Sequence, residues 1–122
     1  MGLDMFAFTT ALTLSGAVDF PEPEDAQELH YWRKHPNLHG WMGELYDAKG
    51  GKKADFNCVG VVLESDDLDD LETAIRKNQL PETQGFFFGA SDGSEIEDDL
   101  SFVAKARAAI REGKTVYYTS WW

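Results

Sequence analysis

The feature that most constrains the fold is an apolar run over residues 56–64, FNCVGVVLE, which follows the polar stretch KGGKKAD. Apolar side chains at consecutive positions are typical of a strand covered on both faces, so the run predicts a central strand of a sheet. Just after it, Leu68, Leu71 and Ile75 recur at helical spacing. The chain is therefore expected to form a sheet with at least one helix packed against it.

The remaining elements follow from the same two periodicities. We expect strands over residues 3–9, 85–89 and 115–121, with residues 11–20 continuing the first strand through a turn. We expect helices over residues 24–35, 36–46, 65–80 and 94–113, the third of them capped by Ser65 or Asp66. This order predicts a single domain, residues 1–122, of the α+β or α/β class, with one mixed sheet of about four strands and helices packed on it.

The composition is acidic, with 22 acidic and 11 basic residues and a net charge of −11. Such a chain repels nucleic acid and anionic membranes, so we expect neither as a direct partner. No apolar run approaches the roughly 20 residues that span a bilayer, and the opening MGLDMFAF lacks the basic start of a secretory signal. The single cysteine, Cys58, lies in the apolar run and predicts a buried thiol in a reducing compartment, the cytoplasm.

The acidic residues gather in two clusters, over residues 64–72 and 92–99, and both clusters begin predicted helices. Basic residues such as Arg76 and Arg111 fall toward the ends of the same helices. The helix macrodipole favours this distribution, so helix capping explains much of the clustering without any partner. Imitation of DNA, with the acids occupying a host nucleic-acid-binding protein, is the alternative.

Residues 30–41, HYWRKHPNLHGW, concentrate histidines, rings and bases in an otherwise acidic chain. His35 and His39 are four positions apart, but Pro36 lies between them and no cysteine or third histidine follows at ligand spacing, so we predict no metal site. The chain has neither a Walker-type phosphate loop nor a G-x-S-x-G elbow. We therefore predict no catalytic residue and no cofactor.

Aromatic residues exceed what a small core easily holds, and some of them suggest a binding surface. Rings stack on nucleobases, and an arginine guanidinium pairs with phosphate. We therefore predict a surface for a small, anionic, nucleotide-like ligand, with Arg33 as the anion contact. The alternative is that helices cover both faces of the sheet and all rings belong to the core. The predicted ligand-binding residues are Tyr31, Trp32, Arg33, Lys34, His39, Trp41, Phe87 and Tyr118.

Six segments of the chain also carry a resemblance: MGLDMFAF, YWRKHPNLHGWM, DFNCVGVVL, LPETQGFFFG, DDLSFVAKARAAI and VYYTSWW. In the same order, and over nearly the whole chain, they resemble a widespread group of small phage and prophage proteins. Those proteins share an MGLDMYL-like start, a YWRK-x-x-x-(I/L)-H-x-W block and a GFFFG block, and Phe6 stands here where a tyrosine is usual. The recurring residues of the group correspond to Asp4, Tyr31, Trp32, Arg33, Lys34, His39, Trp41, Asn57, residues 85–89, Ser120 and Trp121.

The resemblance implies a phage accessory protein that acts in the cytoplasm of a bacterial host, in host takeover or counter-defence. Because catalytic motifs are missing, we expect a homo-oligomer that acts by non-catalytic binding, either of a nucleotide-like signal or of a host defence protein. Two alternatives stay open. One is an acidic, DNA-mimicking inhibitor, and the other is a small enzyme in which Asp4, His39 or Asn57 converge in one pocket.

Overall fold

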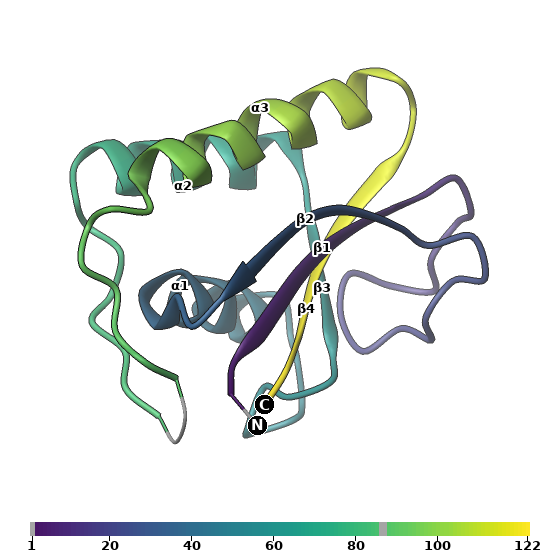
Figure 1. The fold of residues 1–122 in the computed structure, drawn as a ribbon. Coiled ribbons are helices and arrows are strands. Elements are labelled where there is room, and N and C mark those ends of the chain that lie inside the picture. The colour runs from purple at the N-terminus through teal and green to yellow at the C-terminus, as the bar shows by residue number, and fades with distance from the viewer. Residues whose placement is uncertain (1, 86–87) are drawn as a thin grey trace.

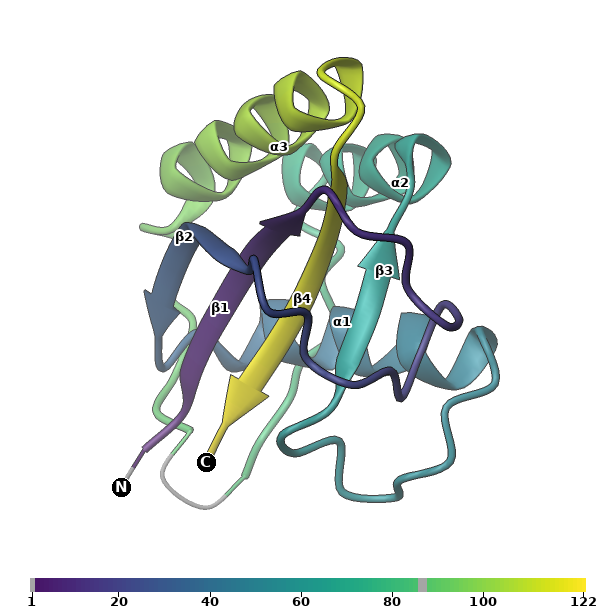
Figure 2. The ribbon, with the colours of Figure 1, turned by 90° about the vertical axis from the view of Figure 1, so that its right-hand side faces the viewer.

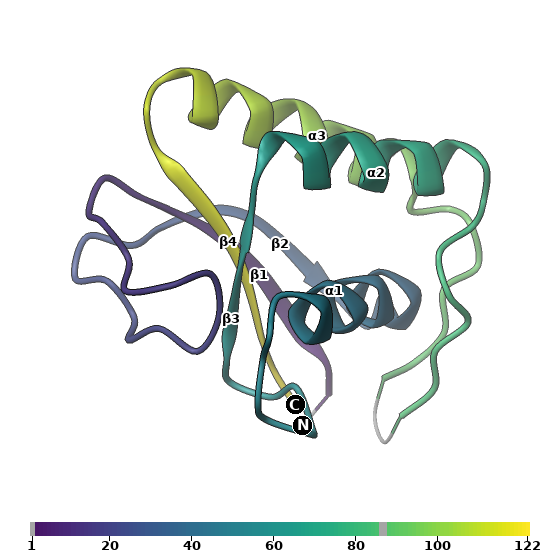
Figure 3. The ribbon, with the colours of Figure 1, turned by 180° about the vertical axis from the view of Figure 1, so that it is seen from behind.

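The computed structural model describes residues 2–85 and 88–122, and it confirms the α+β class. The elements, in chain order, are β1 (Asp4–Thr10), β2 (Gln27–Arg33), α1 (Pro36–Ala48), β3 (Gly60–Leu63), α2 (Ser65–Arg76), α3 (Ile96–Arg111) and β4 (Thr115–Trp121). The helices lie on one side of the sheet, and the long connection from β1 to β2 lies on the other (Figure 1, Figure 3). The two faces of the sheet therefore have different coverings.

The strands are arranged in the order β2-β1-β4-β3, and all neighbouring pairs are antiparallel. The expected mixed sheet is thus wrong in this detail. Between β3 and β4 the chain passes through two helices, α2 and α3, which return it to the end of the sheet at which β3 stops. β4 must then run back antiparallel to β3. The strands predicted over residues 3–9 and 115–121 are confirmed as β1 and β4, and these two strands form the centre of the sheet.

The apolar run over residues 56–64 forms an edge strand, β3, instead of the predicted central one. Only its second half is extended, because Phe56 and Cys58 have positive φ angles of 46° and 62°. These two residues turn the chain before β3 begins. Cys58 is consequently exposed, so the prediction of a buried thiol is wrong.

The outer edge of β3 is covered by the connection from β1 to β2, which explains why an edge strand has a two-sided apolar pattern. Val18 forms an isolated antiparallel bridge with Val61. The Val62 N–H donates to the Ala17 carbonyl oxygen at 2.9 Å. Figure 2 shows the same connection passing over the face of the sheet that the helices leave open.

Residues 27–33 form β2, although the sequence predicts a helix over residues 24–35. His30 and Trp32 are buried, whereas Tyr31 and Arg33 are exposed, which is the alternation of a strand. The physical reason is pairing with β1, which satisfies the backbone of these residues and decides against the helix.

The acidic residues before β2 act in the turn between the strands instead of starting a helix. Asp25 accepts hydrogen bonds from the Thr10 hydroxyl and from the Ala11 N–H, the latter at 2.8 Å. The Thr10 hydroxyl is the main reason why the pKa of Asp25 lies below its ordinary value. Asp25 therefore fastens the connection to the end of β1.

The predicted helices over residues 36–46, 65–80 and 94–113 are confirmed as α1, α2 and α3. The N-cap of α2 is Glu64, one residue before the predicted cap, and it forms a capping box with Asp67. Gly113 follows α3 with a φ of 87°, as a helix-ending glycine does. The strand predicted over residues 85–89 includes residues 86 and 87, which lie outside the described part, and Gly85, Phe88 and Gly89 belong to no strand.

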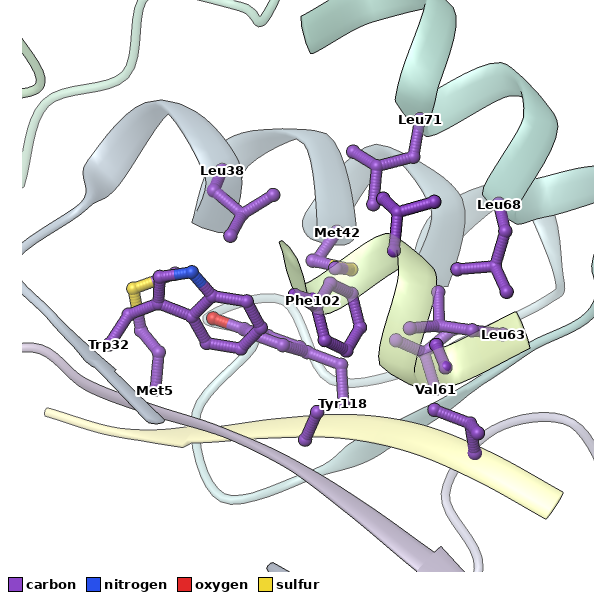
Figure 4. Close-up of a cluster of buried hydrophobic side chains, with 14 of the residues drawn as sticks. Met5, Trp32, Leu38, Met42, Val61, Leu63, Leu68, Leu71, Phe102 and Tyr118 are labelled. Atoms are coloured by element: carbon purple, nitrogen blue, oxygen red, sulfur yellow. The ribbon is translucent and has the colours of Figure 1, made fainter. Parts of the chain in front are cut away.

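The hydrophobic core fills the space between the sheet and the helices. Figure 4 shows Met5, Trp32, Val61, Leu63 and Tyr118 of the sheet gathered with Leu38 and Met42 of α1, Leu68 and Leu71 of α2, and Phe102 of α3. All of these side chains are buried. Because core side chains fill this side of the sheet, the opposite face is the one that has room for a ligand.

Candidate ligand-binding site

The face of the sheet opposite the helices carries a continuous row of aromatic rings. Alternation along the strands places Phe6, Phe8, Tyr31 and Tyr117 on this face, and Phe20 reaches it from the β1–β2 connection. Neighbouring ring centroids are 5.2 Å apart for Tyr31 and Phe6, 5.7 Å for Phe6 and Phe8, 5.6 Å for Phe8 and Tyr117, and 5.1 Å for Tyr117 and Phe20. We call these five residues the ring row.

One end of the ring row opens into a hollow of about 380 Å³, a size that suits a small organic ligand. The hollow is lined by Phe6, Phe8, Phe20, Glu22, Cys58, Gly60, Tyr117, Thr119, Ser120 and Trp121. Trp121 is 67% exposed at its rim. The walls thus combine aromatic rings with one carboxylate.

Gly60 makes room for the ring that closes the hollow. A Cβ atom at this position would lie 2.6 Å from the Phe20 ring, which is too close for a real contact. Phe20 in turn stands edge-on against Tyr117, with an angle of 85° between the two rings. A glycine in β3 therefore determines where the connection lies on the sheet.

Tyr117 supplies the polar group of the hollow. Its side chain is nearly fully buried, and within the described part of the chain its hydroxyl has no hydrogen-bond partner. Burial, with smaller contributions from the negative charges of Glu22 and Asp25, raises the pKa of Tyr117 to about 12. The hydroxyl therefore stays neutral at physiological pH and keeps its proton. A buried donor without a partner costs about 1–3 kcal/mol, which an acceptor atom of a ligand would recover.

The other end of the ring row carries a polar cluster. The Tyr31 hydroxyl donates to Asp4 Oδ1 at 2.6 Å, and Arg33 Nε lies 3.7 Å from the same oxygen. The hydrogen bond to Asp4 is the main cause of a raised pKa for Tyr31. The guanidinium of Arg33 remains about half exposed, with 55% of its side-chain surface open to solvent. This cluster places a positive charge beside the rings.

The structure separates the eight predicted ligand-binding residues instead of gathering them on one surface. Tyr31 and Arg33 lie on the open face of the sheet. Trp32 and Tyr118 are buried on the helix side, because neighbouring residues of a strand point to opposite faces. His39 is buried as well, in α1. Lys34 is exposed just after β2 with a φ of 55°, Trp41 packs against the core from α1, and Phe87 lies outside the described residues.

His39 has the environment of a core histidine. Its Nδ1 lies 2.7 Å from the Tyr118 hydroxyl, and the rings of Phe56 and Phe88 are centred 5.0 Å and 5.2 Å from the imidazole. Burial lowers the pKa of His39 to about 4. The imidazole is therefore neutral at physiological pH and offers no positive charge to an anion.

The enzyme alternative considered from the sequence would require Asp4, His39 and Asn57 to converge, and these three side chains do not meet. Asp4 belongs to the polar cluster on the open face, and His39 is buried on the helix side. The side-chain amide of Asn57 bonds the backbone of Trp122, donating to its carbonyl oxygen at 2.9 Å and accepting from its N–H at 3.0 Å. Asp4 is thus on the other face of the sheet from His39, and the amide of Asn57 is occupied by the Trp122 backbone.

Sequence reasoning missed most of the hollow. The alternation in β1 already separates Phe6 and Phe8 from Met5 and Ala7, but it cannot say which set faces the helices. Residues 20 and 22 reach the hollow only through the path of the connection, for which the sequence carries no signal.

Comparisons with known protein families, with curated proteins and with solved structures find no match for this chain. Among residues 2–85 and 88–122, histidine, cysteine, aspartate and glutamate side chains form no group of three or more that could hold a metal ion. The same residues include no helix long and apolar enough to cross a membrane. The candidate site therefore has to be interpreted from its own geometry.

Proposed function

We propose that this protein binds a small, planar, nucleotide-like ligand on the open face of its sheet, without catalysis at that site. The observation that carries the proposal is the hollow walled by aromatic rings, one of which, Tyr117, has a buried hydroxyl with no hydrogen-bond partner among the described residues. A nucleobase has the aromatic face and the polar edge that such a hollow would accept.

Each part of the ligand has a partner of suitable chemistry in this proposal. The base stacks on the ring row, a contact that contributes about 1–3 kcal/mol. The Tyr117 hydroxyl donates to a ring nitrogen or carbonyl oxygen of the base, and Glu22 accepts from an amino group. Arg33, at the far end of the row, offers a planar cation to the anionic part of the ligand.

The charges near the face favour a small ligand over a polynucleotide. Asp4, Glu22 and Asp25 lie close to the ring row, and the whole chain has a net charge of −11. A nucleic-acid strand would bring many phosphates against this negative field. A single nucleotide brings few, and Arg33 can offset them.

The biological setting that we propose rests on the sequence resemblance to phage and prophage proteins. Sequestration of a signalling nucleotide in the bacterial cytoplasm would serve host takeover or counter-defence without any catalytic step. We also propose that the protein forms a homo-oligomer. The exposed Trp121, at the rim of the hollow, is the side chain that a second copy would cover.

The alternative of an acidic, DNA-mimicking inhibitor has less support, because several of its acids are already engaged. Arg107 pairs with Asp69, at 2.7 Å, and also with Glu72. Asp67 pairs with Lys49 at 2.5 Å, and Asp99 is buried. Asp69 and Glu72 thus join α2 to α3, Asp67 joins α2 to the end of α1, and Asp99 joins α3 to Trp32 and His35.

Calorimetric titration of the purified protein with nucleoside monophosphates and cyclic dinucleotides tests the proposed function. We expect at least one of these compounds to bind. Tyr117→Phe should weaken that binding about threefold to tenfold, because it removes one donor and keeps the ring. Arg33→Ala should weaken it about tenfold or more by removing a charge-assisted contact, whereas Arg111→Ala, at the exposed end of α3, should leave it unchanged.

Two results would overturn the proposal. The first is that no compound of the panel binds and that mass spectrometry finds no nucleotide-like molecule released when the protein from phage-infected cells is denatured. The second is that Tyr117→Phe alters self-association while nucleotide binding stays undetectable, because the ring row itself, and not only Trp121 at the rim, would then be the contact between subunits.

A further inference from the structure

Three side chains that are distant in the sequence meet at the beginning of α1, away from the ring row. His35 Nε2 lies 2.8 Å from Asp99 Oδ2, and His35 Nδ1 lies 2.6 Å from Ser91 Oγ. His35 directly precedes α1, Asp99 is in the first turn of α3, and Ser91 is in the connection before α3. A carboxylate, an imidazole and a hydroxyl thus stand in a hydrogen-bonded line.

The buried carboxylate of Asp99 favours the tautomer of His35 in which Nε2 carries the proton. Asp99 is 2% exposed, and its second oxygen accepts a hydrogen bond from Trp32 Nε1 at 3.1 Å. The hydrogen bonds from Trp32 and His35 hold the two oxygens of Asp99 in fixed positions. With the Nε2–H of His35 donated to Asp99, the Nδ1 lone pair faces Ser91 and can accept its hydroxyl proton. Serine hydrolases have the same order of acid, base and nucleophile, although there the carboxylate binds Nδ1 of the imidazole and the serine binds Nε2.

Ser91 is also accessible to a substrate. It lines a hollow of about 280 Å³ together with His35, Asp92, Gly93, Glu95 and Asp99, among others. The Asn37 N–H, in the first turn of α1, points at Ser91 Oγ from 3.1 Å. This hydrogen bond fixes Ser91 Oγ at the N-terminal, positive end of α1. Glu95 Oε2 lies 3.6 Å from His35 Nδ1 and would stabilise the imidazolium.

We propose that Ser91, activated by His35 and Asp99, is the nucleophile of a small hydrolytic centre for carboxylic esters. The carboxylates of Asp92 and Glu95 line the hollow, so the acyl group should be neutral or cationic, and an anionic ester should be rejected. This centre is separate from the proposed nucleotide site and does not depend on it.

The reaction would proceed in two balanced steps. Ser91 Oγ attacks the carbonyl carbon while its proton passes to His35 Nδ1, the ester C–O bond breaks, and the imidazolium returns the proton to the departing alcohol. Water then attacks the acyl-Ser91 ester with His35 as the base. The products are the alcohol and the carboxylic acid, and Ser91 regains its hydroxyl proton.

A fluorophosphonate probe tests the nucleophile without knowledge of the natural substrate. The serine oxygen displaces fluoride from phosphorus, and peptide mass spectrometry identifies the modified residue. We expect labelling of Ser91 in the folded wild-type protein, no labelling at that position in Ser91→Ala, and labelling slowed about 100-fold or more in His35→Gln. Ser94, exposed in the same connection, is the internal control and should stay unlabelled.

Hydrolysis of p-nitrophenyl butyrate gives a second measurement on the same proteins. We expect kcat/KM to fall about 100-fold or more in Ser91→Ala and to be unchanged in the control Ser94→Ala. Circular dichroism confirms that each variant is folded. Tyr117→Phe should not alter labelling, and Ser91→Ala should not alter nucleotide binding, so either proposal can fail alone.

The competing explanation is that Ser91 only caps α1 through the Asn37 N–H. If the folded wild-type protein is not labelled at Ser91, or if His35→Gln labels as fast as wild type while remaining folded, the hydrolytic centre is wrong and the cap explanation stands.

Discussion

At the scale of single residues, burial decides which side chains can carry charge. His39 contacts Tyr118 and the rings of Phe56 and Phe88, and burial lowers its pKa to about 4. Its unfolded value is about 6.5, so between these two pH values the unfolded chain binds a proton that the folded protein does not. The stabilisation that comes from neutral His39 is therefore present above pH 6.5 and is lost as the pH falls toward 4.

We expect the free energy of unfolding to decrease by about 2 kcal/mol between pH 7 and pH 5, measured by urea denaturation. His39→Gln should flatten this dependence, because glutamine offers hydrogen-bonding atoms but does not titrate. An equally steep dependence in His39→Gln would show that another group causes it.

The residue scale also shows how far the candidate site could be predicted. Of the residues for which the sequence predicts ligand binding, Tyr31 and Arg33 lie on the open face, and their binding role stays a prediction. Trp32 and Tyr118 carry the same kind of ring, but a strand turns neighbouring side chains to opposite faces, and only the packed helices decide which face is covered. Ser91, His35 and Asp99 meet because the tertiary fold brings distant segments of the chain together, and no local sequence pattern predicts that contact.

At the scale of elements, segments whose apolar residues fit only the helical or only the strand period could be predicted. Segments whose apolar residues fit both periods could not. The α2 sequence has apolar positions only at helical spacing, and every residue of β4 except Ser120 is β-branched or aromatic. The β2 sequence, QELHYWR, fits either element, and its pairing with β1 makes it a strand. Similarly, β3 is apolar on both sides because residues 17–20 cover it, which a sequence pattern cannot distinguish from a central position.

Amide hydrogen exchange should detect this covering. Val61 and Val62 both pair with β4, but the Val62 N–H donates to the Ala17 carbonyl oxygen of the connection, so by alternation the Val61 N–H points toward β4. In Phe20→Ala the connection loses its ring contact with Tyr117, so the Val62 amide should exchange about tenfold faster or more. The amide of Val61 is the control and should change much less. Equal acceleration of both amides would mean that β3 opens as a whole.

At the scale of the whole molecule, the last residues of the chain join the sheet to the loop before β3. The Trp122 N–H and carbonyl bond Asn57, its Nε1 donates to the Phe56 carbonyl oxygen at 3.3 Å, and its ring stands edge-on to Phe88 with centroids 5.0 Å apart. The neighbouring Trp121 is 67% exposed. Two adjacent tryptophans therefore have different roles, one in folding and one at the rim of the hollow.

We expect Trp122→Ala to lower the free energy of unfolding by about 2–3 kcal/mol, less than a fully buried tryptophan would cost. Trp121→Ala is the matched variant and should change stability by about 0.5 kcal/mol or less. Thermal and urea unfolding of both variants provide the comparison. Similar losses in the two variants would contradict the division of roles.

The pairing of residues 17–19 of the connection with β3 also favours solubility of the protein at high concentration. An unpaired strand edge is a template on which other chains can add strands and begin a fibril. The protein closes this template at β3 with its own backbone, and at the opposite end of the sheet β2 presents the charged side chains of Glu28 and Arg33. Growth of a continuous sheet from molecule to molecule is therefore opposed at both edges. At β3 the edge is already paired with the connection, and at β2 the charged side chains oppose pairing.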